Sequence, residues 1–189
     1  MKNIVIFASG AGSNADNIIR YFQKNEIISV VAVLSNNPKA KVLEKAKNLG
    51  VACLSFDKDE LYGDFVQSKL AVFKADLIVL AGFLWKFPTH LIAEYPDKII
   101  NIHPALLPKY GGKGMYGQHV HQAVLNQQEK ETGITIHFVN AEFDKGRIIF
   151  QKSVSILNCV TPDEIATKVH ELEHRYFPEV INELLTTND

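Results

Sequence analysis

The 189-residue sequence has few cysteines and little net charge, and both facts exclude several classes of protein. Cys53 and Cys159 stand alone in the sequence, so neither a disulfide framework nor paired metal-ligating cysteines are expected. No stretch approaches the roughly 18 apolar residues that a membrane-spanning helix needs. The formal net charge of -1 gives no basic surface for nucleic acid. This charge balance suits a small polar ligand. Because the N-terminal apolar run is too short for a signal peptide, we expect a cytoplasmic protein.

Short apolar runs alternate with amphipathic segments along the chain, which is typical of a parallel α/β sheet. We predict buried strands over 4–8, 29–34, 51–55, 76–81 and 98–102, followed by an antiparallel pair over 133–140 and 147–156. Helices are predicted over 15–22, 41–49, 59–73, 88–94 and 119–126. A last helix should begin after Thr161, which has the capping-box pattern, and should be kinked or interrupted at Pro178. The sequence therefore predicts one domain, 1–189, with a Rossmann-like open sheet that is mostly parallel and has helices on both faces.

A glycine-rich turn follows the first predicted strand. Residues 9–14 read Ser-Gly-Ala-Gly-Ser-Asn, and a helix comes directly after them. A strand, a glycine turn and a helix start form a phosphate cradle, because glycines allow close approach and the free N–H groups attract an anion. Gly10, Gly12 and Ala15 also fit the dinucleotide fingerprint, but no acidic residue ends the second predicted strand, which argues against NAD. A tight turn without a ligand is the alternative.

Asn101 and His103 end a predicted buried strand at a proline. The strand period of two places both side chains on one face, where an amide and an imidazole can polarise a carbonyl and stabilise an oxyanion. Asp144 is a candidate carboxylate that would favour the charged imidazole, although spacing alone does not bring it there. The alternative is a histidine that only caps the strand end. Without a Gly-x-Ser-x-Gly elbow or a cysteine nucleophile motif, direct transfer to a bound nucleophile is favoured.

Two loops and two histidines allow more than one interpretation. The connection 104–118 holds four glycines and is long enough to be a functional or mobile loop. The apolar and aromatic loop 82–88 is consistent either with a pocket for a flat ligand or with ordinary packing. His119 and His121 lie two apart on a predicted helix, so they cannot jointly bind a metal from it, and we interpret both as surface or loop-packing residues. No metal site is expected.

Several of these segments resemble the folate-dependent formyltransferases. They are residues 9–14, 80–84, 133–139 and 144–146, the pair Glu173-His174, and the run Asn-Ile-His-Pro-Ala-Leu-Leu-Pro-Lys-Tyr at 101–110. They extend over nearly the whole chain in the family's order and spacing. The Asn-x-His-Pro-x-Leu-Leu-Pro segment is specific to the superfamily, and the glycine turn with Glu173-His174 is similar to the branch that serves purine synthesis.

The resemblance implies a reaction and a set of site residues. It implies transfer of a formyl group from 10-formyltetrahydrofolate to the amine of glycinamide ribonucleotide, with Asn101, protonated His103 and Asp144 as the catalytic set. It implies contacts to the acceptor from Gly12, Ser13 and Asn14 at the phosphate, with Glu173 at the glycinamide end and Pro104 beside it. It implies a folate site formed by Phe83, Leu84, Trp85, Lys86, Phe87, Val139, Asn140, Ala141, Glu142, Phe143 and Asp144. Trp85 and Lys86 differ from the family's usual arginine and aliphatic residue.

Other relatives carry the same trio and are weighed against this interpretation. The methionyl-tRNA enzyme should have an added C-terminal domain and a basic surface, and the formyltetrahydrofolate hydrolase an N-terminal regulatory domain. Sugar-nucleotide N-formyltransferases, which use the same folate donor, are the nearest alternative. A non-catalytic or dinucleotide-binding Rossmann-like domain is the alternative from a different class. We expect small-molecule partners only, and a monomer or homodimer.

Overall fold

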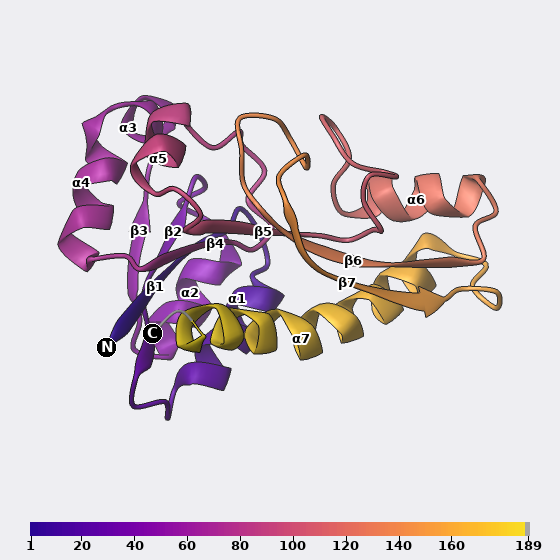
Figure 1. Ribbon diagram of the computed structural model, residues 1–189, viewed down its shortest axis with the longest axis horizontal. Helices are drawn as coiled ribbons and strands as arrows, with labels where there is room; N and C mark the ends of the chain where they lie inside the picture. The colour runs from indigo at the N-terminus through magenta and orange to yellow at the C-terminus, as the bar shows by residue number, and fades with distance from the viewer. Residues whose placement is uncertain (188–189) are drawn as a thin grey trace.

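The computed structural model describes residues 1–187 as one seven-stranded sheet with helices on both faces (Figure 1). In chain order the elements are β1 (Lys2–Phe7), α1 (Ser13–Phe22), β2 (Ile28–Ser35), α2 (Lys41–Asn48), β3 (Ala52–Ser55), α3 (Lys58–Tyr62), α4 (Asp64–Phe73), β4 (Leu77–Leu80), α5 (Thr89–Glu94), β5 (Ile99–His103), α6 (Gln118–Asn126), β6 (Glu131–Phe138), β7 (Ile148–Ser155) and α7 (Pro162–Thr186). The strand order is β3-β2-β1-β4-β5-β6-β7. Strands β1 to β5 pair in parallel, whereas β5 with β6 and β6 with β7 are antiparallel. The predicted mostly parallel sheet with an antiparallel addition is confirmed.

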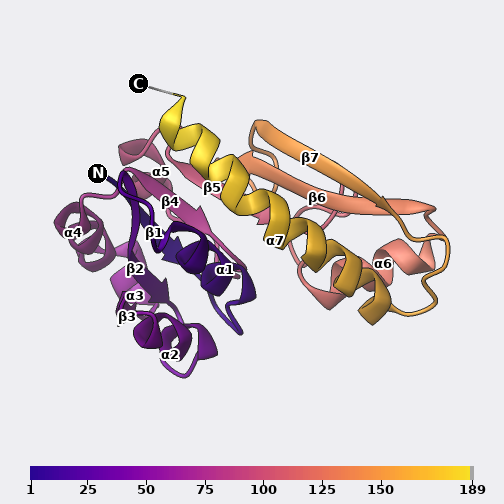
Figure 2. The same cartoon turned by 90° about the horizontal axis from the view of Figure 1, so that it is seen from below.

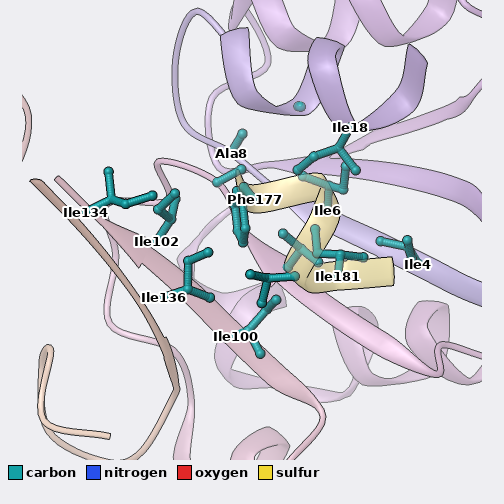
Figure 3. Close-up of a cluster of buried hydrophobic side chains, with 14 of the residues drawn as sticks. Ile4, Ile6, Ala8, Ile18, Ile100, Ile102, Ile134, Ile136, Phe177 and Ile181 are labelled. Carbon is teal, nitrogen blue, oxygen red and sulfur yellow. The ribbon is translucent and has the colours of Figure 1, made fainter. Parts of the chain in front are cut away.

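Strand β1 contributes to both layers of the core because its side chains alternate between the two faces of the sheet. Ile4 and Ile6 pack in the layer that includes α1, α2 and α7, while Val5 and Phe7 pack in the layer that includes α3, α4 and α5. Figure 3 shows Ile4 and Ile6 in one cluster with isoleucines of β5 and β6 and with Phe177 of α7. The continuous apolar run in the sequence therefore reflects burial on both faces.

The segment predicted as one helix over 59–73 is two helices, α3 and α4, separated at Gly63. Gly63 is extended, with φ -98° and ψ -159°, so the helical hydrogen-bond ladder ends there. The helix starts earlier than predicted, at a capping box between Asp57 and Glu60. The spacing of apolar residues does not predict this break, because Leu61 of α3 and Val66 of α4 both pack in the same buried layer.

Helix α7 continues from Pro162 to Thr186 although Pro178 lies inside it, so the expected interruption does not occur. Pro178 has no N–H, which leaves the carbonyl of His174 without its helical donor. The side-chain Nδ2 of Asn17 in α1 donates to that carbonyl at 2.6 Å. Figure 2 shows α7 as one long helix across the sheet, and it contacts α1, α6, β6 and β7. Within residues 1–187, no helix combines the length and the apolar character that a membrane span requires.

Candidate active site

A cavity of about 730 Å³ opens at the carboxyl ends of β1, β4 and β5. Its walls come from residues 10–14, 80–87, 101–104 and 112–118, from His121, His137, Val139, Asn140 and residues 142–144, and from α7. Ligands of open α/β sheets bind at this edge. Every predicted site residue lines the cavity except Ala141, which is exposed in the loop after β6 and is absent from the wall.

The glycine turn leaves the first N–H groups of α1 directed at the cavity. Gly12 has φ +69°, and an added Cβ would overlap Val42 of α2, so both its backbone conformation and its close packing require glycine. Within the described chain, no side chain caps α1. The turn therefore keeps the free donors and the positive helix end that a phosphate site needs, and the phosphate cradle stays a prediction.

Asn101 is held between two partners at the end of β5. Antiparallel pairing places it opposite His137 of β6. Its Nδ2 lies 3.1 Å from His137 Nε2 and 3.4 Å from Asp144 Oδ1. The Nδ1 of His137 lies 2.8 Å from the carbonyl oxygen of Phe138, which can only accept a hydrogen bond. A hydrogen on Nδ1 of His137 therefore donates to the Phe138 carbonyl, while Nε2 of His137 lies between Asn101 and Asp144 Oδ1, 3.5 Å from the latter.

His103 is buried, with 3% of its side chain exposed, and each ring nitrogen faces an acceptor. Its Nε2 lies 2.7 Å from the carbonyl oxygen of Tyr110, and its Nδ1 lies 3.5 Å from Asp144 Oδ2. The short contact assigns the hydrogen of the neutral ring to Nε2, since a carbonyl accepts only. Nδ1 then has a free lone pair beside the carboxylate. The predicted proximity of His103 and Asp144 is confirmed.

Asp144 lies in a left-handed turn that places its carboxylate at the cavity wall. Its φ is +56°, which is uncommon for a residue other than glycine, asparagine or aspartate. Two residues later, an added Cβ on Gly146 would overlap the carbonyl of Phe138, so this glycine lets the turn pack against the end of β6. The N–H of Gly112 donates to Asp144 Oδ2 at 2.9 Å. These contacts fix the position of the Asp144 carboxylate.

Burial decides the charge of His103 in the ligand-free site. Burial lowers the pKa of His103 and outweighs the opposing effects of Asp144 and the Tyr110 carbonyl. Burial also acts to raise the pKa of Asp144, but its contacts with His137, His103 and the Gly112 N–H outweigh that effect and lower the pKa. A neutral imidazole therefore faces an ionised carboxylate. The protonated His103 that the resemblance implies for the reaction stays a prediction, because burial favours the neutral ring in the free site.

A second polar cluster lies where α1 meets α7. Glu173 is 5% exposed, and its Oε2 accepts from Asn14 Nδ2 at 2.9 Å and pairs with His170 Nδ1 at 2.8 Å. The ion pair with Glu173 raises the pKa of His170. Asn14 Oδ1 and His121 Nδ1 are buried and have no hydrogen-bond partner among residues 1–187. Polar atoms that are buried without a partner at a cavity wall indicate where a polar ligand can bind.

The position of His121 corrects one interpretation of the sequence. His121 is 3% exposed and lines the cavity, so it is not a surface or loop-packing residue, whereas His119 is exposed. Burial lowers the pKa of His121, which favours its neutral ring. In the part of the chain that is described, no group of three or more His, Cys, Asp and Glu residues could hold a metal ion.

An aromatic wall closes the opposite side of the cavity. Phe83 and Phe87 lie edge-on to Phe7, with ring centroids 5.6 and 5.3 Å away, and Trp85 lies 6.4 Å from Phe56. The N–H of Leu84 donates to Ser9 Oγ at 2.9 Å and ties this loop to the glycine turn. The loop packs into the core and also lines the cavity, so the predicted packing is confirmed and a pocket for a flat ligand stays a prediction. Flat apolar surfaces of this kind suit an aromatic ring system.

Sequence reasoning did not identify four groups at this site: His137, His121, His170 and the Tyr110 carbonyl. His170 lies three residues before Glu173, a spacing that places both side chains on one face of a helix and could have been noticed. His137 shares a predicted strand with alternating apolar residues, but only the register with β5 brings it to Asn101.

Residues 2–181 match the family model described as Formyl transferase. The chain is 34% identical over 195 residues to phosphoribosylglycinamide formyltransferase of Bacillus subtilis, covering 100% of this chain and 97% of that protein. It is 38% identical over 187 residues to the chloroplastic phosphoribosylglycinamide formyltransferase of Arabidopsis thaliana, covering 95% of this chain but only 64% of that protein. The crystal structure of the Bacillus halodurans phosphoribosylglycinamide formyltransferase superposes with a TM-score of 0.89 at 32% identity, covering 100% of this chain and 97% of the other.

Proposed function

The chain belongs to the formyl transferase family, and from this premise we propose that it transfers the formyl group of 10-formyltetrahydrofolate to the amine of glycinamide ribonucleotide, a step of purine biosynthesis. The observation that carries the proposal is the juxtaposition of His103 and Asp144. An imidazole nitrogen with a free lone pair lies 3.5 Å from an ionised carboxylate at the wall of a cavity large enough for two substrates. This arrangement suits proton transfer during attack by an amine.

The acceptor fits the α1 side of the cavity. The free N–H groups at the start of α1 suit its phosphate, and His170 and Lys113 add positive charge to the same cavity wall. Glu173 Oε2 and the unpartnered Asn14 Oδ1 are acceptors for the hydroxyl and amine hydrogens of such a molecule. Pro104 lies in the wall next to the catalytic set.

The folate donor fits the opposite side. Its pteridine is flat and aromatic, and the wall formed by Phe83, Trp85 and Phe87 offers ring surfaces for it. Residues Val139, Asn140, Glu142 and Phe143 form the facing wall, with main-chain donors and acceptors for the polar ring edge. Placing the two substrates on opposite sides brings the formyl group to Asn101 and His103.

His103 and Asn101 divide the chemistry between them. Nδ1 of His103 accepts the proton that the acceptor amine loses as its nitrogen bonds to the formyl carbon, and Asp144 stabilises the imidazolium that results. Asn101 Nδ2 turns from its long contact with Asp144 to donate to the formyl oxygen as negative charge develops there. When the bond from the formyl carbon to the folate nitrogen breaks, the imidazolium returns the proton to that nitrogen, and the neutral ring is restored.

A substrate comparison tests the proposal. Purified protein is incubated with 10-formyltetrahydrofolate and either glycinamide ribonucleotide or an amino-sugar nucleotide, with a third reaction that lacks any acceptor. We expect formylated glycinamide ribonucleotide by mass spectrometry and an equal amount of tetrahydrofolate by absorbance. Transfer only to the amino-sugar nucleotide would support the sugar-nucleotide N-formyltransferase alternative. Release of tetrahydrofolate without an acceptor would indicate a hydrolase, and no reaction in any mixture contradicts the proposed activity.

A further inference from the structure

One short segment of main chain contacts both members of the proton-transfer pair. The Tyr110 carbonyl lies 2.7 Å from His103 Nε2, and the Gly112 N–H donates to Asp144 Oδ2 at 2.9 Å. Between them, an added Cβ on Gly111 would overlap Leu107 and lie 3.2 Å from the Cβ of Asp144. The segment is therefore packed closely against the catalytic carboxylate, and small movements of its main chain alter both contacts.

Tyr110 adopts a backbone conformation that a bulky residue rarely takes. Its φ is +58°, in the left-handed region, which costs free energy unless other contacts compensate. Its hydroxyl donates to Glu129 Oε1 at 2.8 Å, and Lys109 Nζ donates to the same oxygen at 2.8 Å. Glu129 lies in the turn between α6 and β6, outside the cavity wall. The side chain of Tyr110 thus anchors the strained main chain to a different part of the fold.

The position of the Tyr110 carbonyl matters because a neutral imidazole has one hydrogen and His103 faces two acceptors. The carboxylate of Asp144 is the stronger acceptor by charge, but it lies 3.5 Å from Nδ1, whereas the carbonyl lies 2.7 Å from Nε2. If the carbonyl moves away, the hydrogen passes to Nδ1 and bonds to Asp144. Nδ1 then has no free lone pair with which to accept a proton.

We propose that Tyr110 is a positioning residue for His103: the bond from its hydroxyl to Glu129 fixes its carbonyl, which keeps the imidazole hydrogen on Nε2 and leaves Nδ1 free as the base. The role of Nδ1 rests on the proposed formyl transfer, whereas the control of the tautomer does not. Glu129 lies outside both substrate sites and affects His103 only through its hydrogen bond with Tyr110.

The test compares His103 in the wild-type protein with Tyr110→Phe, Glu129→Ala and Glu129→Gln by nitrogen-15 NMR of the imidazole, which distinguishes the two neutral tautomers. Tyr110→Phe keeps the ring and removes only the hydroxyl, and Glu129→Ala removes its acceptor. We expect both to shift His103 toward the Nδ1-protonated tautomer and to lower kcat about threefold to tenfold, with KM for the acceptor unchanged. Glu129→Gln retains an acceptor oxygen and should behave like the wild type.

Lys109→Gln is the matched control, because it removes the other donor to Glu129 and leaves the tyrosine bond in place. We expect it to keep the Nε2-protonated tautomer and the wild-type kcat. A wild-type tautomer in both Tyr110→Phe and Glu129→Ala overturns the inference, as does an equal shift in Lys109→Gln. Because the NMR reading needs no turnover, a shifted tautomer in a protein without formyl transfer contradicts the proposed function and leaves the positioning role intact.

Discussion

Asn101 on β5 lies opposite His137 on β6, and the nitrogen atoms of the two side chains are 3.1 Å apart. This contact joins the parallel part of the sheet to its antiparallel addition at the proposed catalytic set. A slip of one residue in this register would turn His137 to the other face of β6, because side chains alternate along a strand. The antiparallel addition therefore contributes a side chain to the proposed active site as well as strands to the fold.

Replacing the base should nearly abolish turnover. We expect His103→Ala to lower kcat about a hundredfold to ten-thousandfold, the range that proton transfer by a positioned side chain contributes. Steady-state assays of formyl transfer measure the loss, and circular dichroism tests whether the fold is retained. His90→Ala is the matched control, since His90 is exposed on α5 and outside the cavity wall. Wild-type kcat in a folded His103→Ala protein would refute the mechanism.

The pH dependence should follow the pKa of His103. Burial holds this pKa below its ordinary value of 6.5, so the acidic limb of kcat/KM, which falls as the base is protonated, should lie below pH 6.5. Asp144→Asn removes the negative charge that favours the imidazolium, so we expect the limb to move to lower pH while the plateau falls. Rates measured from about pH 4.5 to 8 cover the range over which a histidine titrates. Movement of the limb to higher pH contradicts this assignment.

Removing the Asn14 side chain should weaken binding of the acceptor more than it lowers kcat. Asn14→Ala deletes the donor to Glu173 and the unpartnered oxygen in the cavity. We expect the dissociation constant of glycinamide ribonucleotide to rise about tenfold, as for the loss of one good hydrogen bond to a polar ligand. Calorimetry with the acceptor alone measures this without turnover. Asn48→Ala, on the exposed end of α2, should bind as the wild type does; equal affinity in both variants excludes Asn14 from the site.

The continuity of α7 should depend on Asn17. Asn17→Ala leaves the His174 carbonyl without a donor, and we expect the free energy of unfolding to fall by about 1 kcal/mol. Pro178→Ala restores an N–H at position 178 that can donate to the same carbonyl. In that background Asn17→Ala should cost less, and denaturant titration of the four proteins gives the coupling. If the cost is the same in both backgrounds, the side chain does not replace the missing helical donor.

Features of the fold that depend on neighbouring residues could be predicted from the sequence. The apolar run from Ile4 to Phe7 forms a buried strand, and Thr161 with Glu164 forms the capping box that starts α7. Features that depend on distant contacts could not be predicted. The continuity of the helix through Pro178 requires Asn17 from another helix, and the break at Gly63 is hidden because both sides bury apolar residues.

The same distinction applies to the site. The sequence indicated Asn101, His103 and Asp144 as a set through their resemblance to a family, and the structure brings the three side chains together. The charge of His103 depends on the balance between burial and a carboxylate 41 positions away in the chain, which no local pattern reveals. The burial of His121 could not be predicted either, because it depends on how α6 packs against α7.

The hydrogen bond from Asn14 to Glu173 has a consequence for synthesis of the protein. It joins two residues 159 positions apart, so the ribosome makes the glycine turn and α1 long before it makes the carboxylate that completes the cavity. The wall of the cavity that contains Asn14 and Glu173 is therefore complete only when α7 packs against α1.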